Sequence, residues 1–415
     1  MMIKEVKKGS TLIVKGPARV IVLEGKIEVF GKIIEPDKTK SPSEISEYED
    51  ENVLIVPSAN TYPFYGLANS KLEIYTSNED NIKLIDTNSI SEEWIAIKDA
   101  LLENIKKSKE KGKALKIMVI GLSSGKSSLI KYLANNFYRE GLKGAYLDSD
   151  LGQQTIYLPT TISIGEIKTP IVASDDIQPE NTIFIGATFP KGNYKFIISH
   201  YCNDLIEEYL KKHQDTNYIN IDGDSWVLSE AGIIYKKFFI DIVDPDVVII
   251  FQNESVEELE VIYDHAKKSR KDRKIHLIKE QNSYFYEKTK DERRFLRQSQ
   301  FAKILEVYRK ISIPLSHNEI EFIKTDYNPE TKEIKEIPIG VYDLNQLPYH
   351  YVIVSLLDKN SKLIKLGLLF TINIEKDYML IFSDLTYKEQ IKVKKVLLGS
   401  LRLSTKGNHQ GYLYL

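Results

Sequence analysis

The chain has 415 residues, of which 42% are hydrophobic and 28% are charged, and its formal net charge is −2. These values are ordinary for a globular protein of two or three domains, and they exclude a global basic field, so any nucleic-acid contact must come from a local patch. The single cysteine, Cys202, excludes an internal disulfide and a cysteine-based zinc site. With no apolar run near the roughly 18 residues of a membrane span and no apolar signal core, we expect a cytoplasmic protein.

Short β-branched runs separated by turn residues fill the first part of the chain. They cover residues 11–14, 18–23, 26–30, 52–56 and 71–75. This pattern predicts a small β-sandwich-like domain over residues 1–88. The polar segment 36–50 is expected to be a surface loop.

From residue 89 to residue 308 the pattern alternates helices and strands. Apolar residues at helical spacing, from Trp94 to Ile105, predict a helix over 92–111. The next elements are, in order, strand 117–120, a helix to about 140, strand 144–147, helix 194–213, strand 218–221, helix 229–243, strand 247–251, helix 256–269 and strand 274–278. This alternation predicts an α/β domain with a mainly parallel sheet, whose ligands bind at the carboxyl ends of the strands.

The last part of the chain, residues 309–415, returns to short strands and turns. Apolar runs at 351–356, 366–370 and 378–382 predict a second β-rich domain.

Residues 116–130 combine an apolar strand, a turn of glycines and serines, and an amphipathic helix. Backbone N–H groups of such a turn point at an anion on the helix N-terminus, which predicts a P-loop. The predicted nucleotide-binding residues are Gly121, Ser123, Ser124, Gly125, Lys126, Ser127 and Ser128. Lys126 would reach the β- and γ-phosphates, and Ser127 would place its hydroxyl on Mg²⁺.

This turn departs from the usual P-loop pattern in one respect. Three residues separate Gly121 from Gly125, where the pattern has four. Either the loop is one residue short, or Ile120 occupies the position of the first glycine. The alternative interpretation is an ordinary Gly/Ser turn before a helix.

Two carboxylates, Asp148 and Asp150, follow the second strand of the α/β domain. A pair at this place can hold Mg²⁺ through water and accept a proton from an attacking hydroxyl, which is the division of labour in phosphoryl transfer. We predict a metal site at this pair, with Asp148 as its metal residue. A solvated turn is the alternative.

Three further features carry chemistry. Asp222 ends a strand and could belong to a metal shell, while Trp226 could stack on a base of a single-stranded nucleic acid or lie in the core. In the segment 288–297, Arg293 or Arg294 shares a helical face with Arg297. Such arginines can neutralise the transferring phosphoryl group when a helix closes over ATP, or they form a solvated basic face.

The order of these motifs resembles the polynucleotide 5′-hydroxyl kinases of RNA processing. The motifs are the phosphate loop, Asp148-Ser-Asp-Leu-Gly-Gln153, and the segments 159–163, 184–193, 222–226 and 288–297. That family includes RNA 3′-end cleavage-factor kinases, ribosomal-RNA-processing kinases and archaeal relatives. The resemblance spans nearly the whole chain, because the family also flanks its kinase domain with an N-terminal β-sandwich and a C-terminal β-rich domain.

The resemblance also implies roles for single residues. Lys126 and Ser127 would bind ATP·Mg²⁺, and Asp150 would deprotonate the RNA 5′-hydroxyl. Gln153 and Thr188 would hold the phosphate of the acceptor, and Trp226 would stack on its terminal base. Arg294 and Arg297 would form the lid.

Two departures from the family pattern bear on activity. The family's phosphate loop carries an aspartate before Gly-Lys-Ser, where this chain has Ser123 and Ser124, and its Thr-x-Gly-Trp turn is here Gly-Asp-Ser-Trp226. Activity could therefore be altered or lost while nucleotide binding survives.

We expect a kinase that transfers the γ-phosphate of ATP or GTP to the 5′-OH of RNA or DNA, with Mg²⁺ and with RNA-processing proteins as partners. The first alternative is a non-catalytic nucleotide-binding scaffold of an RNA-processing complex. The second is a different P-loop enzyme, such as a small-molecule kinase, which the flanking β domains disfavour. The sequence leaves open the preferred nucleotide, the preferred nucleic acid and the oligomeric state.

Overall fold

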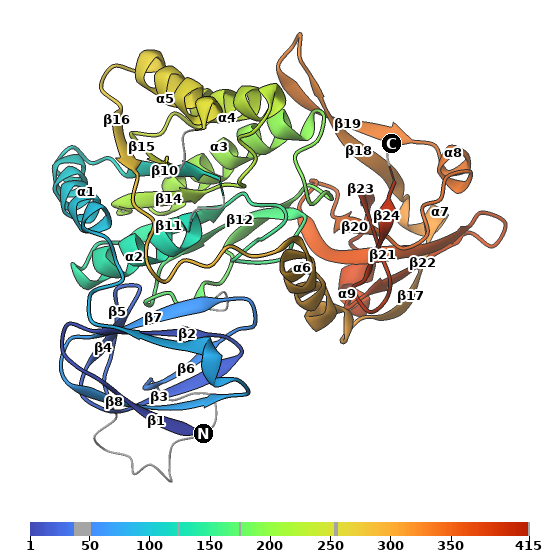
Figure 1. The fold of residues 1–415 in the computed structure, drawn as a ribbon. Helices are drawn as coiled ribbons and strands as arrows, with labels where there is room; N and C mark the ends of the chain where they lie inside the picture. Colours follow the sequence, from blue (N-terminus) through green and yellow to red (C-terminus); the bar gives the residue numbers. More distant parts are fainter. Residues whose placement is uncertain (37–50, 123–124, 174–175, 253–255, 414–415) are drawn as a thin grey trace.

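The computed structural model describes residues 1–36, 51–122, 125–173, 176–252 and 256–413, and these form an α/β unit flanked by two β-rich units (Figure 1). The predicted fold class is thereby confirmed. Most of the predicted loop at 36–50, and the predicted nucleotide-binding residues Ser123 and Ser124, lie outside the described residues. No described helix combines the length and the apolar character needed to cross a bilayer.

The N-terminal unit consists of two antiparallel sheets. One sheet has the order β1 (Met2–Val6), β8 (Ser70–Thr76), β3 (Ala18–Glu24) and β6 (Val53–Val56). The other has the order β5 (Lys32–Ile34), β4 (Ile27–Val29), β7 (Thr61–Gly66), β2 (Thr11–Lys15) and β9 (Ile82–Ile85), and the short helix η1 (Glu79–Asn81) precedes β9. Alternate residues along β8, such as Leu72 and Ile74, are buried, as expected for a strand with one face on a core.

The central sheet positions the site. Its order is β13 (Asn181–Phe184), β12 (Thr161–Glu166), β11 (Gly144–Asp148), β14 (Tyr218–Asp222), β10 (Leu115–Gly121), β15 (Val247–Phe251) and β16 (Lys274–Ile278). The neighbours in the series β11, β14, β10, β15 and β16 pair in parallel. Strands β12 and β13 add an antiparallel edge beside β11. The mainly parallel sheet is confirmed, although the sequence prediction does not contain its two edge strands.

Helices cover both faces of this sheet. They are α1 (Glu92–Glu110) and α2 (Lys126–Arg139) on one face, and α3 (Tyr194–Lys212), α4 (Glu230–Val243) and α5 (Glu257–Ser269) on the other (Figure 1). The period of two in each strand divides its side chains between two cores. In β15, for example, Val247 and Ile249 belong to the core of α1 and α2, whereas Val248 and Ile250 belong to the core of α3 to α5.

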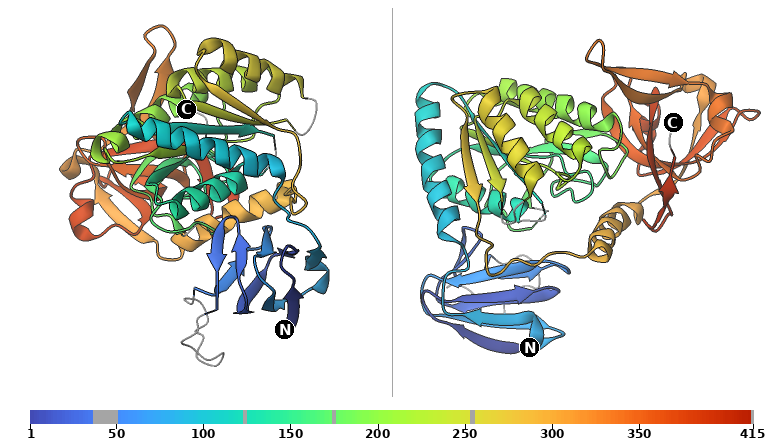
Figure 2. Two further views of the ribbon diagram at one scale, coloured as in Figure 1. Left: turned by 90° about the vertical axis from the view of Figure 1, so that its left-hand side faces the viewer. Right: turned by 45° about the horizontal axis from the view of Figure 1, so that its top comes forward.

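Helix α6 (Lys290–Leu305) leads from the central unit into the C-terminal unit (Figure 2). Thr289 and Glu292 form a capping box that fixes its start. The C-terminal sheet has the order β17 (Arg309–Pro314), β22 (Tyr378–Ser383), β21 (Leu363–Asn373), β20 (Val352–Leu357), β23 (Lys395–Leu403), β18 (Glu321–Asn328) and β19 (Glu333–Ile339), with β24 (His409–Tyr412) paired to β23. Three short helices, α7 (Leu315–Asn318), α8 (Val341–Asn345) and α9 (Tyr387–Gln390), connect these strands.

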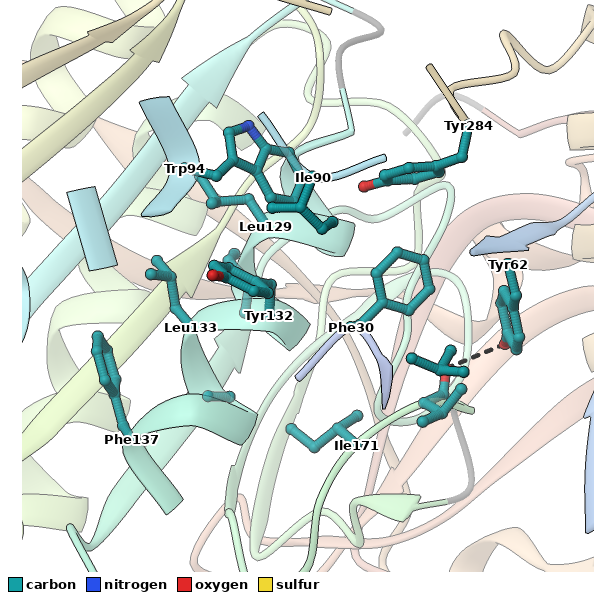
Figure 3. Packing of buried hydrophobic residues seen from close by; sticks show 14 of the residues in the cluster. Phe30, Tyr62, Ile90, Trp94, Leu129, Tyr132, Leu133, Phe137, Ile171 and Tyr284 are labelled. Atoms are coloured by element: carbon teal, nitrogen blue, oxygen red, sulfur yellow. Dashed lines mark hydrogen bonds between the residues drawn. The ribbon is translucent and has the colours of Figure 1, made fainter. Parts of the chain in front are cut away.

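The N-terminal and central units share one continuous apolar core (Figure 3). The ring of Phe30 lies 5.5 Å from that of Tyr62 and 5.4 Å from that of Tyr284, and Tyr284 in turn lies 6.4 Å from Trp94 of α1. The Tyr62 hydroxyl donates a hydrogen bond of 3.0 Å to the carbonyl of Val172. Edge-to-face aromatic contacts of this kind hold the two units in one orientation.

The C-terminal and central units meet through backbone groups. The carbonyl of Gly186, just after β13, accepts hydrogen bonds from Ser400 N at 2.8 Å and Leu401 N at 3.1 Å. A Cβ atom on Gly186 would stand only 2.3 Å from Cα of Gly399, so a glycine is required for the approach. Strand β23 is therefore fixed directly against the segment that leads to Thr188.

Candidate active site

The strand β10 ends at Gly121 and the helix α2 begins at Lys126, so the predicted phosphate loop connects them. Gly125 has φ +84° and ψ +20°, a left-handed conformation that favours glycine. As the N-cap residue, Gly125 has no side chain to cap the helix, so the first N–H groups of α2 are suited to an anion.

Lys126 is buried at the first position of α2. Its Nζ donates to the carbonyl of Gly121 at 3.0 Å and to Oγ of Ser225 at 2.6 Å. Burial lowers the pKa of Lys126, and the carboxylates of Asp222 and Asp150 oppose this shift. An anion in the loop would supply the strongest partner for this ammonium group.

Asp222 ends β14, the strand between β10 and β11. Its Oδ2 accepts hydrogen bonds from Ser127 Oγ at 2.5 Å and from the Tyr146 hydroxyl at 2.8 Å. Its Oδ1 is buried without a hydrogen-bond partner among the described residues. Because Mg²⁺ prefers oxygen ligands, this orphaned oxygen and the Ser127 hydroxyl fit a bound Mg²⁺.

Asp148 and Asp150 have different surroundings. Asp148 is fully buried, and its two carboxylate oxygens accept hydrogen bonds from Asp150 N at 2.9 Å and Thr155 N at 2.6 Å. Burial raises the pKa of Asp148 well above its usual value, and Asp222 and Asp150 add to the shift. These bonds let Asp148 shape the turn after β11, whereas the buried oxygen without a partner belongs to Asp222.

Asp150 lies in that turn and is partly exposed. Its Oδ1 accepts hydrogen bonds from Gly152 N and Gln153 N, each at 2.9 Å. Burial, followed by the charge of Asp224, raises the pKa of Asp150, and Lys126 opposes the shift. A carboxylate with a raised pKa is the better general base near neutral pH.

The predicted acceptor residues lie on three different elements. Gln153 donates to the carbonyl of Gly152 at 2.7 Å and to that of Arg293 at 3.2 Å, which links the turn after β11 to α6. The Thr188 hydroxyl lies 2.9 Å from the Tyr412 hydroxyl. The Trp226 ring is half-buried and lies 4.6 Å from the ring of Phe189, so one side packs on the core of α3 to α5 and the other meets an exposed aromatic ring.

The two arginines that were predicted to form a lid differ in position. Arg297 is half-buried, and its Nη1 would lie 3.7 Å from a Cβ atom on Gly152. Burial lowers the pKa of Arg297, and Tyr412 and Asp150 oppose the shift. Arg294 is 61% exposed and pairs with Asp291 of its own helix at 2.7 Å. The structure therefore brings Arg297 to the site and leaves Arg294 at the surface.

A family model described as "mRNA cleavage and polyadenylation factor CLP1 P-loop" matches residues 121–306. A polyribonucleotide 5′-hydroxyl-kinase of Methanocaldococcus jannaschii is 26% identical over 344 residues, which cover 74% of this chain and 91% of that protein. Residues 121–306 of this chain are therefore similar to the Clp1 P-loop family. A polyribonucleotide 5′-hydroxyl-kinase of Pyrococcus furiosus is 30% identical over 226 residues, which cover 53% of this chain and 60% of that protein.

Solved structures of the Clp1 family share the whole fold. A chain of the Clp1p–Pcf11p complex superimposes with a TM-score of 0.72 at 15% identity and covers 97% of both chains. A second structure, described as showing the extended interface between Pcf11p and Clp1p and the basis of ATP loss in a point mutant, gives a TM-score of 0.71 at 14% identity, covering 97% of this chain and 98% of that one. Both β-rich units therefore have counterparts in these two structures.

The sequence analysis missed four residues at the site. Lys236 of α4 is buried, and its Nζ lies 3.1 Å from Oδ1 of Asp224, which also accepts a bond of 2.7 Å from Trp226 N. A lysine between Tyr235 and Phe239 on the buried face of a helix is the signal that could have found this pair. Phe189 and Tyr412 have no such signal, because their partners lie on other elements.

Proposed function

We propose that this chain is a polynucleotide 5′-hydroxyl kinase of RNA processing, which transfers the γ-phosphate of ATP to the 5′-hydroxyl of RNA. The observation that carries the proposal is the place of Asp150. A Cβ atom on Gly152 would lie 3.5 Å from Oδ1 of Asp150 and 3.7 Å from Nη1 of Arg297, so the carboxylate and the lid-side guanidinium lie against the same glycine. On the nucleotide side, the charge of Lys126 opposes the rise in the pKa of Asp150. A nucleotide-binding scaffold needs Lys126 alone, whereas a kinase also needs a base and a cation on the other side of the γ-phosphate.

The nucleotide side supplies positioning and charge. Lys126 would exchange its bonds to Gly121 and Ser225 for the β- and γ-phosphate oxygens, which lie on the N–H groups that begin α2. Ser127 and Asp222 would hold Mg²⁺, which when bound neutralises charge on the phosphates. The name of the solved Clp1p structure refers to ATP, and this supports ATP as the nucleotide.

On the acceptor side, Asp150 would accept the proton of the 5′-hydroxyl. The hydroxyl oxygen would attack the γ-phosphorus at the same time, and ADP would leave. Arg297 would neutralise charge on the transferring phosphoryl group. Gln153 and Thr188 would hold the first phosphate of the acceptor, and Trp226 with Phe189 would stack on its terminal base. The names of the archaeal relatives specify a polyribonucleotide, which supports RNA as the acceptor.

The experiment that tests the proposal supplies ATP labelled at the γ-phosphate together with 5′-OH RNA and DNA oligonucleotides of the same sequence. We expect label at the 5′ end of the RNA, and GTP in place of ATP measures nucleotide preference. Nucleotide binding without transfer to either acceptor would overturn the kinase proposal in favour of the scaffold.

We also infer that the chain works with a protein partner. The support is the likeness to Clp1p, which was solved together with Pcf11p. Co-purification of the tagged chain from its own cells, with mass spectrometry of what it retains, tests this inference. Recovery of the chain alone would contradict it.

A further inference from the structure

Strand β24 of the C-terminal unit lies beside the acceptor residues of the central unit. The Tyr412 hydroxyl and the Thr188 hydroxyl are 2.9 Å apart. Tyr412 also opposes the lowering of the pKa of Arg297, so it lies near both the acceptor segment and α6. The proposed kinase function assigns no role to this strand.

The position of β24 is fixed by two neighbours, β23 and α6. It pairs with β23, where Tyr412 stands opposite Leu401, and the N–H of Leu413 donates to the carbonyl of Ser400 at 2.6 Å. The turn before it packs on α6, because a Cβ atom on Gly407 would lie 2.9 Å from the carbonyl oxygen of Gln298. Figure 2 shows β24 on the side of the C-terminal unit that faces α6.

The exposed face of β24 carries two rings next to cationic groups. The rings of His409 and Tyr412 lie 4.8 Å apart at 65°, and both side chains are exposed, Tyr412 to 39%. Partial burial lowers the pKa of His409, and the charges of Arg297 and Arg294 lower it further. Aromatic rings beside guanidinium groups are the features that bind successive bases and phosphates of a single strand.

Chain geometry connects this face to the acceptor. If Thr188 holds the first phosphate of the acceptor, the next nucleoside is attached to that same phosphate. Its base then lies within reach of the ring whose hydroxyl contacts Thr188. We propose that His409 and Tyr412 form a second acceptor subsite, which holds the nucleotide after the one that is phosphorylated. This inference rests on the proposed function for the place of the first phosphate.

The test compares two acceptors of equal charge that differ only in the second nucleoside. A nucleoside 3′-methylphosphate fills the first subsite alone, and a dinucleoside monophosphate fills both. Their affinities for the full chain are measured by calorimetry, without any need for turnover. We expect the wild type to bind the dinucleoside monophosphate about 5- to 150-fold more tightly, the range that corresponds to stacking of one base.

Variants separate stacking from a merely structural contact. In Tyr412→Ala and His409→Ala the affinity ratio of the two acceptors should fall towards one. Tyr412→Phe keeps the ring and loses the contact with Thr188, so it should retain the ratio. Tyr387→Ala, in the same unit and 76% exposed, is the matched control and should also retain it. If Tyr412→Ala does not fold, His409→Ala and Tyr412→Phe still decide the outcome.

Two results would overturn the subsite. One is equal affinity of the wild type for both acceptors. The other is an equal loss of affinity for both acceptors in Tyr412→Ala, which would show that Tyr412 only supports Thr188. A kinase assay with the same acceptors keeps the two proposals apart. Binding that depends on Tyr412, with no transfer to any acceptor, would uphold the subsite and reject the kinase.

Discussion

The two sides of the site are built differently. On the nucleotide side, Lys126 and Asp222 are buried, and Asp222 already accepts hydrogen bonds from Ser127 and Tyr146. On the acceptor side, Phe189 is 45% exposed, Trp226 is half-buried and Arg294 points to solvent. Preorganised buried groups stabilise charge because they need no rearrangement during the reaction, while exposed rings can adapt to different bases. Substitutions on the nucleotide side, in the base and at Arg297 should therefore impair the chemical step, and substitutions of the residues that hold the acceptor should impair affinity.

The sharpest test of this comparison is Asp150→Asn, which keeps the shape of the side chain and removes its basicity. General-base assistance contributes about 10²–10⁴-fold in rate, so phosphorylation of 5′-OH RNA should fall by that factor. The affinities for ATP and RNA should change little in equilibrium binding. If Asp150→Asn phosphorylates RNA at the wild-type rate and Asp148→Asn does so slowly, Asp148 is the base instead.

The next largest effect is expected for Lys126→Ala. Loss of one preorganised cationic donor at the phosphates should lower kcat by about 10²–10³-fold and also weaken ATP binding. Circular dichroism should show a folded protein. Lys107→Ala, a substitution of a lysine 69% exposed on α1, is the control that should change neither quantity. A folded Lys126→Ala variant with wild-type affinity and turnover would reject the phosphate loop.

Trp226→Ala tests the acceptor side of the site. Loss of one stacking ring should cost about 1–3 kcal/mol of oligonucleotide binding and leave ATP binding nearly unchanged. Titration of labelled RNA with the variant measures the first quantity, and thermal unfolding measures stability. A large fall in Tm together with loss of ATP binding would instead identify Trp226 as a core residue.

The smallest effect is expected for Arg294→Ala. Its exposed pair with Asp291 contributes about 0–1 kcal/mol, so the free energy of unfolding should change by no more than that. Turnover should change by less than about tenfold, because Arg294 lies at the surface. Arg297→Ala, which removes the half-buried arginine near Asp150, should lower kcat more. Equal losses in the two variants would indicate that α6 moves during the reaction and brings both arginines to the phosphoryl group.

Local patterns in the sequence predicted the parts of the molecule that depend on neighbouring residues. The parallel strands β10, β11, β14, β15 and β16 are short apolar runs between helices. Asp148 and Asp222 directly follow such runs. Strand β7 was missed because Pro63 interrupts its pattern, and β24 was missed because His-Gln-Gly-Tyr has no β-branched residue. The contact between Thr188 and Tyr412 joins residues 224 positions apart, and no local pattern reports a contact of this range.

The approach of Gly186 to Gly399 also constrains how relatives of this chain can diverge. A methyl group on Gly186 would stand 2.3 Å from Cα of Gly399, and one on Gly399 would stand 2.8 Å from Cα of Gly186. Neither position can accept a side chain unless the C-terminal unit shifts away, and such a shift would separate Tyr412 from Thr188. The geometry therefore requires glycine at both positions, and an exchange of the C-terminal unit with that of a distant relative should keep this contact only when both glycines are retained.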